Sequence, residues 1–122
     1  MTARRVSLIL NRMVQYRHGR NLDLVAGAIA DPTRRAILAR LSRGPATVSD
    51  VAAAFSMTLT GFCKHVRVLE RARLVRRTRR GRAKVLALSA EPLREVANWA
   101  LQYEKFWNER LDRLQAFFEK EK

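Results

Sequence analysis

Apolar residues recur every three or four positions through most of the chain, which predicts a largely helical protein. The pattern predicts short helices over residues 3–17 and 22–29. The next helix begins at Asp31 and Pro32, because aspartate caps a helix and proline fits its first turn without losing a hydrogen bond. This helix ends at the Gly-Pro pair of residues 44–45, where the chain must turn.

Two helices separated by a tight turn follow. Thr47 and Asp50 form a variant of the capping box and predict a short helix that continues through Phe55. After a turn at residues 56–58, a second helix covers about 59–72. Its apolar positions follow one another at intervals of three, four and three, and we expect all of them to be buried: Leu59, Phe62, Val66 and Leu69.

The periodicity changes after this helix. Residues 75–78 and 84–88 are compatible with β-strands, and the segment between them reads as a hairpin turn with Gly81 at the position that needs a positive φ. A single long helix is then predicted from about residue 91 to Phe118. The order of elements is that of a winged helix-turn-helix, mainly α with a small β-hairpin wing.

The chain divides into three parts of one domain: a basic N-terminal extension over 1–20, a winged-helix core over 21–90 and a C-terminal dimerisation helix over 91–122. A length of 122 residues suffices for one core, and 48% apolar residues are too many for a disordered tail. No apolar run approaches the roughly 18 residues of a membrane span. The single cysteine excludes an internal disulfide framework and fits a cytoplasmic protein.

Positive charge is concentrated in the middle of the chain. The total is 25 Lys and Arg against 11 Asp and Glu, a net charge of +14. Residues 64–84 contain ten basic residues and one acid, a net charge of +9, and residues 1–20 contain five arginines and no acid. The C-terminal residues 91–122, with six bases and seven acids, are nearly neutral. One segment therefore binds a polyanion, and another has a different task.

The helix over 59–72 separates an apolar face from a basic one, as expected of a recognition helix in the major groove. We expect Thr60, Gly61, Cys63 and Lys64 to read bases, and Arg67 and Arg71 to hold phosphates. The arginine-rich hairpin would follow the DNA backbone or enter a minor groove. The predicted DNA-binding residues are Thr58, Thr60, Gly61, Cys63, Lys64, His65, Arg67, Arg71, Arg77, Arg79, Arg80 and Arg82. For His65 a structural role is an alternative.

The last predicted helix has an apolar stripe wider than one small domain needs. A second copy of the chain would cover it, so the predicted partners are double-stranded DNA and the protein itself. The predicted interface residues are Leu93, Val96, Trp99, Ala100, Tyr103, Phe106, Trp107, Leu111, Leu114 and Phe118. Two alternatives stay open: the helix packs wholly against its own core, or its aromatic residues line a small-molecule pocket.

Two segments, residues 30–38 (ADPTRRAIL) and 64–72 (KHVRVLERA), resemble the ArsR/SmtB family of bacterial winged-helix repressors. The resemblance extends from about residue 21 to 118. It implies a homodimeric transcriptional repressor that binds a near-palindromic operator and dimerises through its first and last helices.

The chain departs from the founding members of that family at their metal sites. Residues 48–55 contain no Cys or His, and the last helix contains no His. The soft ligands Cys63, His18 and His65 lie on different elements, whereas zinc needs four ligands close together. We therefore expect no metal site and no cofactor, as in the branch of the family that ends in an aromatic-rich helix.

The chain also differs from the family pattern in the predicted recognition helix. Gly61 and Cys63 stand where relatives commonly have Ala and Ser, and a glycine there weakens the helix by up to roughly 1 kcal/mol. Arg73 replaces the glycine that usually ends this helix, which speaks against a left-handed helix end.

The sequence offers no support for an enzyme, since it contains no glycine-rich phosphate loop and no nucleophile with a credible base. Two other functions stay open beside a sequence-specific repressor. One is a protein that coats nucleic acid without sequence preference. The other is a repressor that responds to an effector such as a metal, a thiol oxidant acting at Cys63, or a small molecule; the inducer itself is unknown.

Overall fold

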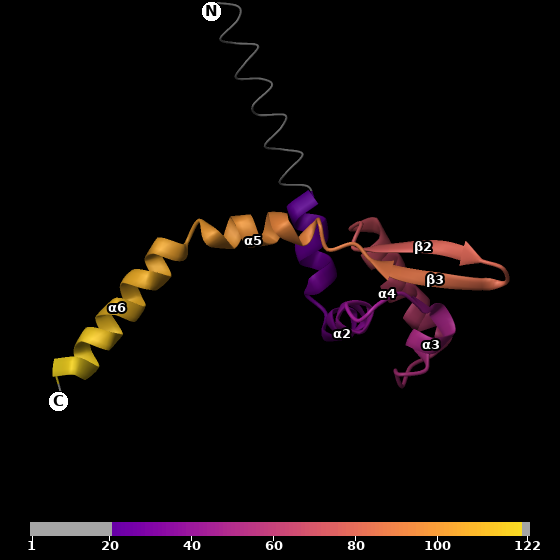
Figure 1. Ribbon diagram of the computed structural model, residues 1–122, viewed down its shortest axis with the longest axis horizontal. Helices are drawn as coiled ribbons and strands as arrows, with labels where there is room; N and C mark the ends of the chain where they lie inside the picture. Colours follow the sequence, from indigo (N-terminus) through magenta and orange to yellow (C-terminus); the bar gives the residue numbers. More distant parts are fainter. Residues whose placement is uncertain (1–20, 121–122) are drawn as a thin grey trace, which may run out of the picture.

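A small antiparallel sheet packs among short helices, and a helical arm leaves this body on the side away from the hairpin tip (Figure 1). The computed structural model describes residues 21–120, so the helix expected over 3–17 lies outside the described residues. The described part of the chain begins with helical residues 21–29. The elements that follow are α2 (Pro32–Leu41), β1 (Ala46–Thr47), α3 (Val48–Ala52), α4 (Leu59–Arg71), β2 (Val75–Arg80), β3 (Ala83–Leu88), α5 (Leu93–Leu101) and α6 (Glu104–Lys120).

Polar side chains cap α2, α3 and α4. The Asp31 carboxylate accepts a hydrogen bond of 3.0 Å from the backbone N–H of Arg34. Thr47 accepts in the same way from the N–H of Asp50, at 3.1 Å. The predicted starts of α2 and α3 are therefore confirmed, but α3 ends at Ala52 rather than Phe55. Beyond Ala52 the backbone bonds tighten to i→i−3 turns, and the Phe55 ring packs against the core.

The sheet has the order β1-β3-β2, with both pairs antiparallel. The strands β2 and β3 pair from Val75↔Leu88 to Arg80↔Ala83, so the hairpin turn is only Gly81 and Arg82. Gly81 has φ +61°, as predicted. The expected five-residue turn was wrong, because the strands continue through the arginines. The two-residue strand β1 was not predicted, since it is too short to show alternation.

The core lies where α2, α3, α4 and the sheet meet. Its largest fully buried side chains are Phe62, Ile37, Leu69, Leu74, Leu86, Val25, Val51 and Val66. Three of the four predicted core positions of α4 are among them. The prediction for Leu59 was wrong: this residue is the first of α4, and its side chain is 61% exposed. A helix's first residue lies at the edge of the buried stripe, so spacing alone did not decide its environment.

The helix α4 ends in a left-handed turn at Arg73, whose φ is 62°. The N–H of Leu74 donates to the carbonyl of Leu69, and the N–H of Arg73 donates to that of Glu70, both at 3.0 Å. These two bonds form a Schellman motif, with Leu69 and Leu74 both fully buried as its apolar contact. The argument from Arg73 against a left-handed end was therefore wrong, because burial of Leu74 stabilises the turn despite the arginine side chain.

The predicted C-terminal helix is in fact two helices, α5 and α6, which form the arm of Figure 1. At the break, the N–H groups of Gln102 and Tyr103 donate to carbonyls three residues earlier. Such tight turns preserve the spacing of threes and fours, and neither Pro nor Gly marks the position, so the sequence pattern continues across it. Within residues 21–120, no helix is long and apolar enough to cross a membrane.

Candidate nucleic-acid interface

The two faces of α4 differ in burial and charge as the sequence predicts. Phe62, Val66 and Leu69 are fully buried against the sheet and α2. On the opposite face, the exposed side chains are Thr60, Lys64, Arg67 and Arg71, with Cys63 half-buried among them. Because the buried face fixes the rotation of the helix, these polar and basic side chains all project from the body on one side.

The first turn of α4 is built around Thr58. Its hydroxyl oxygen accepts the N–H of Gly61 at 3.1 Å and so caps the helix. A Cβ atom on residue 61 would stand 3.2 Å from this oxygen, so glycine leaves room for the cap. The hydroxyl of Thr58 is thereby used within the protein, although Thr58 stays exposed.

His65 lies at the border between the two faces and contacts the start of α2. The Arg34 guanidinium donates to Nδ1 of His65 at 3.2 Å, and it also donates to the carbonyls of Ala28 at 2.6 Å and Gly27 at 3.0 Å. Since the arginine guanidinium has only donors, Nδ1 of His65 is the acceptor in this hydrogen bond. The arrangement ties helix 21–29 to the recognition helix and gives His65 a structural role within the protein.

The Asp31 carboxylate completes this junction, with Oδ2 at 4.0 Å from Nδ1 of His65. The pKa of Asp31 is lowered from its ordinary value, chiefly because the backbone N–H of Arg34 donates to the carboxylate. The positive charge of Arg34 acts in the same direction. The cap of α2 is thus strongest when Asp31 is ionised.

The hairpin β2–β3 carries cations on both of its faces. Successive side chains alternate, so Val75, Arg77 and Arg79 share the face that turns toward α4. Arg77 forms an ion pair of 2.6 Å with Glu70 of α4, which joins the wing to the recognition helix. Of the predicted wing cations, Arg77 is therefore engaged inside the protein, while Arg79, Arg80 and Arg82 are exposed.

Two basic residues of the wing were not among the predicted contacts. Lys84 lies directly opposite Arg79 across the two strands, and Arg76 is exposed on the other face. Like charges that face each other across a strand pair repel, and an anion between them would remove the repulsion. The alternation of the strand could have identified Lys84 as a partner of Arg79, had the strand boundaries been known.

The predicted interface residues fall into two groups. Leu93 and Val96 of α5 pack partly against the core of their own chain. The side chains from Trp99 onward are about half exposed or more, among them Tyr103, Phe106, Trp107, Leu111, Leu114 and Phe118. Ala100, between the groups, is half-buried. Some of the aromatic rings touch one another: Trp99 and Tyr103 lie edge to face with centroids 5.4 Å apart.

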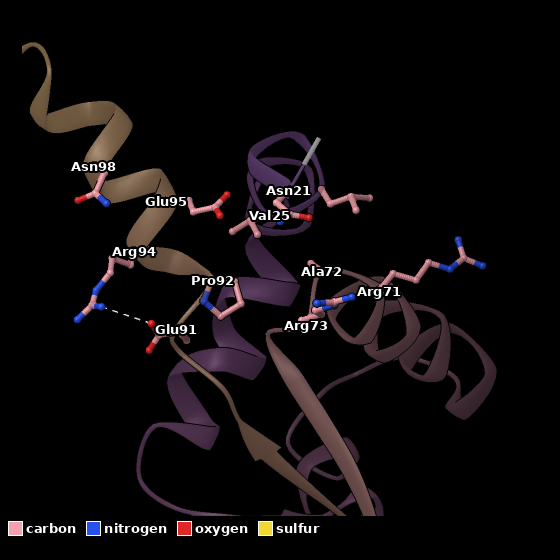
Figure 2. Close-up of a pocket in the computed structure, with 11 residues that line it drawn as sticks. Asn21, Val25, Arg71, Ala72, Arg73, Glu91, Pro92, Arg94, Glu95 and Asn98 are labelled. Carbon is pink, nitrogen blue, oxygen red and sulfur yellow. Dashed lines mark hydrogen bonds and ion pairs between the residues drawn. The ribbon is translucent and has the colours of Figure 1, made fainter. Parts of the chain in front are cut away.

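A cavity of about 390 Å³ lies between helix 21–29, the end of α4 and the start of α5 (Figure 2). Its arginines do not converge on its centre. Figure 2 shows Arg94 turned back to Glu91, with which it forms an ion pair of 3.4 Å, and Arg71 directed away from α5. In the described part of the chain, no three His, Cys, Asp or Glu residues come together as metal ligands would.

A basic helix face beside an arginine-rich hairpin, supported by a helix-turn-helix core, defines a winged helix-turn-helix protein. Comparisons agree with this class. A family model described as a helix-turn-helix domain matches residues 29–78. The transcriptional repressor SdpR of Bacillus subtilis is 33% identical over 82 residues, which are 67% of this chain and 91% of that protein.

Solved structures give the same result. The crystal structure of an ArsR family transcriptional regulator matches with a TM-score of 0.68 and 42% identity, over 74% of this chain and 93% of that one. The solution structure of a homodimeric winged helix-turn-helix DNA-binding domain from Mycobacterium bovis matches with a TM-score of 0.57 and 24% identity, over 70% of this chain and 81% of that one. The chain belongs to the ArsR family of winged helix-turn-helix transcriptional regulators.

Proposed function

We propose that this regulator is a homodimeric repressor that binds a specific duplex sequence, with α4 in the major groove and the β2–β3 hairpin on the backbone or in a minor groove. The observation that carries the proposal is the division of α4 into a fully buried apolar face and an exposed basic one. Such a protein acts in the cytoplasm.

The roles of the basic residues follow from their positions on α4 and the wing. Thr60, Gly61, Cys63 and Lys64 lie in the first half of the helix, where a recognition helix meets base edges. Arg67 and Arg71 lie further along, where a guanidinium would hold phosphates. Arg79, Arg80 and Arg82 would do the same from the wing, and the opposed pair of Arg79 and Lys84 favours an anion beside it.

Dimerisation through the arm is supported by the exposure of its apolar side chains. Soluble monomers rarely expose a contiguous apolar patch as large as this run of aromatic and leucine residues, because its contact with water is unfavourable. A second copy of the arm would cover it with a surface of the same kind. The Mycobacterium bovis neighbour is described as homodimeric, and SdpR as a repressor, which agrees with both parts of the proposal.

Competition binding tests the proposal against nonspecific coating of nucleic acid. Selection of the full chain against randomised duplexes should enrich one near-palindromic sequence. Random competitor should then displace that sequence only at a thousandfold or larger excess, about the specificity of a repressor. Equal competition by random duplex would contradict the proposal.

Two arginine variants test whether DNA binding depends on a particular surface or only on the net charge of the protein. Arg67→Ala should weaken binding to the selected duplex and lower the salt dependence by about one phosphate contact. Arg94→Ala removes the same charge from α5, at a side chain that is 74% exposed, paired with Glu91 and not among the predicted DNA-binding residues. It should bind like the unchanged protein. If both variants lose affinity equally, only the overall charge matters and the proposed interface is wrong.

A further inference from the structure

Leu59 is an exposed apolar residue at the N-terminal end of α4, the part of a recognition helix that meets base edges. It is the first residue of the helix, and its side chain is 61% exposed. Among the described residues, the exposed large apolar side chains otherwise lie on the arm from Trp99 onward, with the exception of Leu24. Leu24 lines the cavity beside α5, so Leu59 stands apart from every other apolar patch described.

Two threonines and a glycine surround Leu59 in the sequence of the first turn. The hydroxyl oxygen of Thr58 accepts the N–H of Gly61, while its O–H proton and its methyl group stay available to a base edge. Gly61 has no side chain and allows a close approach of the backbone. Thr60 is exposed and carries a second methyl group. Leu59 is thus the one large exposed apolar side chain in the first turn of α4, ahead of the cationic surface formed by Lys64 and Arg67.

We infer that Leu59 reads the C5-methyl group of a thymine in each half-site. The inference rests on the proposed function and adds a residue to its specificity. Thymine is the one base that presents a methyl group in the major groove, and apolar side chains contact it there. Against any other base, the leucine would displace water from amino or carbonyl groups without replacing their hydrogen bonds. A leucine at this position therefore favours thymine in two ways: it contacts the methyl group, and it makes binding to the other bases less favourable.

Replacing thymine by deoxyuracil removes only the methyl group and so tests the inference at the level of one contact. The probe is the duplex enriched by the full chain from randomised sequences, with each thymine replaced in turn in both half-sites. At one position the replacement should weaken binding about three- to fivefold for each half-site, the effect of burying a single methyl group. At this position the Leu59→Ala variant should bind both duplexes equally.

Leu101→Ala provides the matched control. Leu101 is 53% exposed, at the end of α5, and lies outside the predicted stripe of the arm. This variant should retain the full preference for thymine over uracil. Thermal unfolding of Leu59→Ala should be close to that of the unchanged protein, since the side chain is exposed.

The possible results separate this inference from the function on which it rests. Selection that enriches no sequence would overturn the proposed function. Specific binding without any uracil effect, a half-site without thymine, or a Leu59→Ala variant that still prefers thymine would overturn the inference and leave the proposed function intact.

Discussion

The winged-helix core and the C-terminal arm bury their apolar residues in opposite ways. In the core, the side chains of helix 21–29, α2, α3, α4 and the sheet fill a continuous interior, and none of the buried residues described is polar or charged. The arm has no buried residue in either α5 or α6, although it contains most of the aromatic side chains. The core thus buries its apolar side chains within one chain, whereas the large apolar side chains of the arm from Trp99 onward are exposed.

The largest expected effect is on the stability of the core, and it tests whether α4 is held by its buried face. Phe62→Ala should lower the free energy of unfolding by about 3–5 kcal/mol, because it removes a fully buried ring at the junction of α4 with the core. Urea denaturation measures this change, with Leu59→Ala as the exposed control on the same helix. A loss as small as that of the control would show that α4 is not anchored by this face.

The arm should respond differently. Trp107→Ala should weaken dimerisation by about 2 kcal/mol or more, roughly thirtyfold, because exposed tryptophans become anchors when an interface covers them. Sedimentation equilibrium over a range of protein concentrations measures the dissociation constant. Asn108→Ala changes the neighbouring residue and should leave it unaltered. Equal dissociation constants for the two variants would contradict a dimer through this stripe.

A smaller effect concerns the turn that joins α4 to the wing. Arg73→Gly should stabilise the protein by up to about 1 kcal/mol, since glycine adopts a positive φ without the steric conflict of a side chain. Arg73→Ala removes the same charge but keeps the conflict, so it should give no such gain. Thermal unfolding of the two variants distinguishes backbone strain from charge. A gain in both would assign the effect to charge instead.

The smallest effect depends on pH. The folded state lowers the pKa of Asp31 below its ordinary value of 3.8, so ionisation of Asp31 stabilises the fold above that value. This contribution is lost as the pH falls through the lowered pKa. Asp31→Asn keeps a cap but cannot ionise, so its stability should approach that of the unchanged protein as the pH drops. A difference that stays constant with pH would contradict this role.

Much of the core could be predicted from sequence because its signals are local. Asp31 and Thr47 mark helix starts through their own hydrogen bonds, and the spacing of Phe62, Val66 and Leu69 defines the buried face of α4. Gly81 identifies the hairpin turn for the same reason. In each case the residue type and the neighbouring few positions determine the conformation.

The errors arose where distant contacts decide the structure. Arg73 adopts a left-handed conformation because Leu74 is buried in the core. The residues next to Arg73 in the sequence do not reveal this burial. The pair of Arg77 with Glu70 likewise depends on how β2 packs against α4, so Arg77 looked like a free wing cation. The break between α5 and α6 involves neither Pro nor Gly and leaves the apolar spacing intact.

The central claim is that the basic face of α4 and the adjacent hairpin form one DNA-binding surface that twofold symmetry repeats. Hydroxyl-radical footprinting of the full chain on its selected duplex tests it most directly. Two protected half-sites, about one helical turn apart and related by a twofold axis, are the predicted result. Uniform protection along the duplex, or protection of a single half-site, would contradict the account.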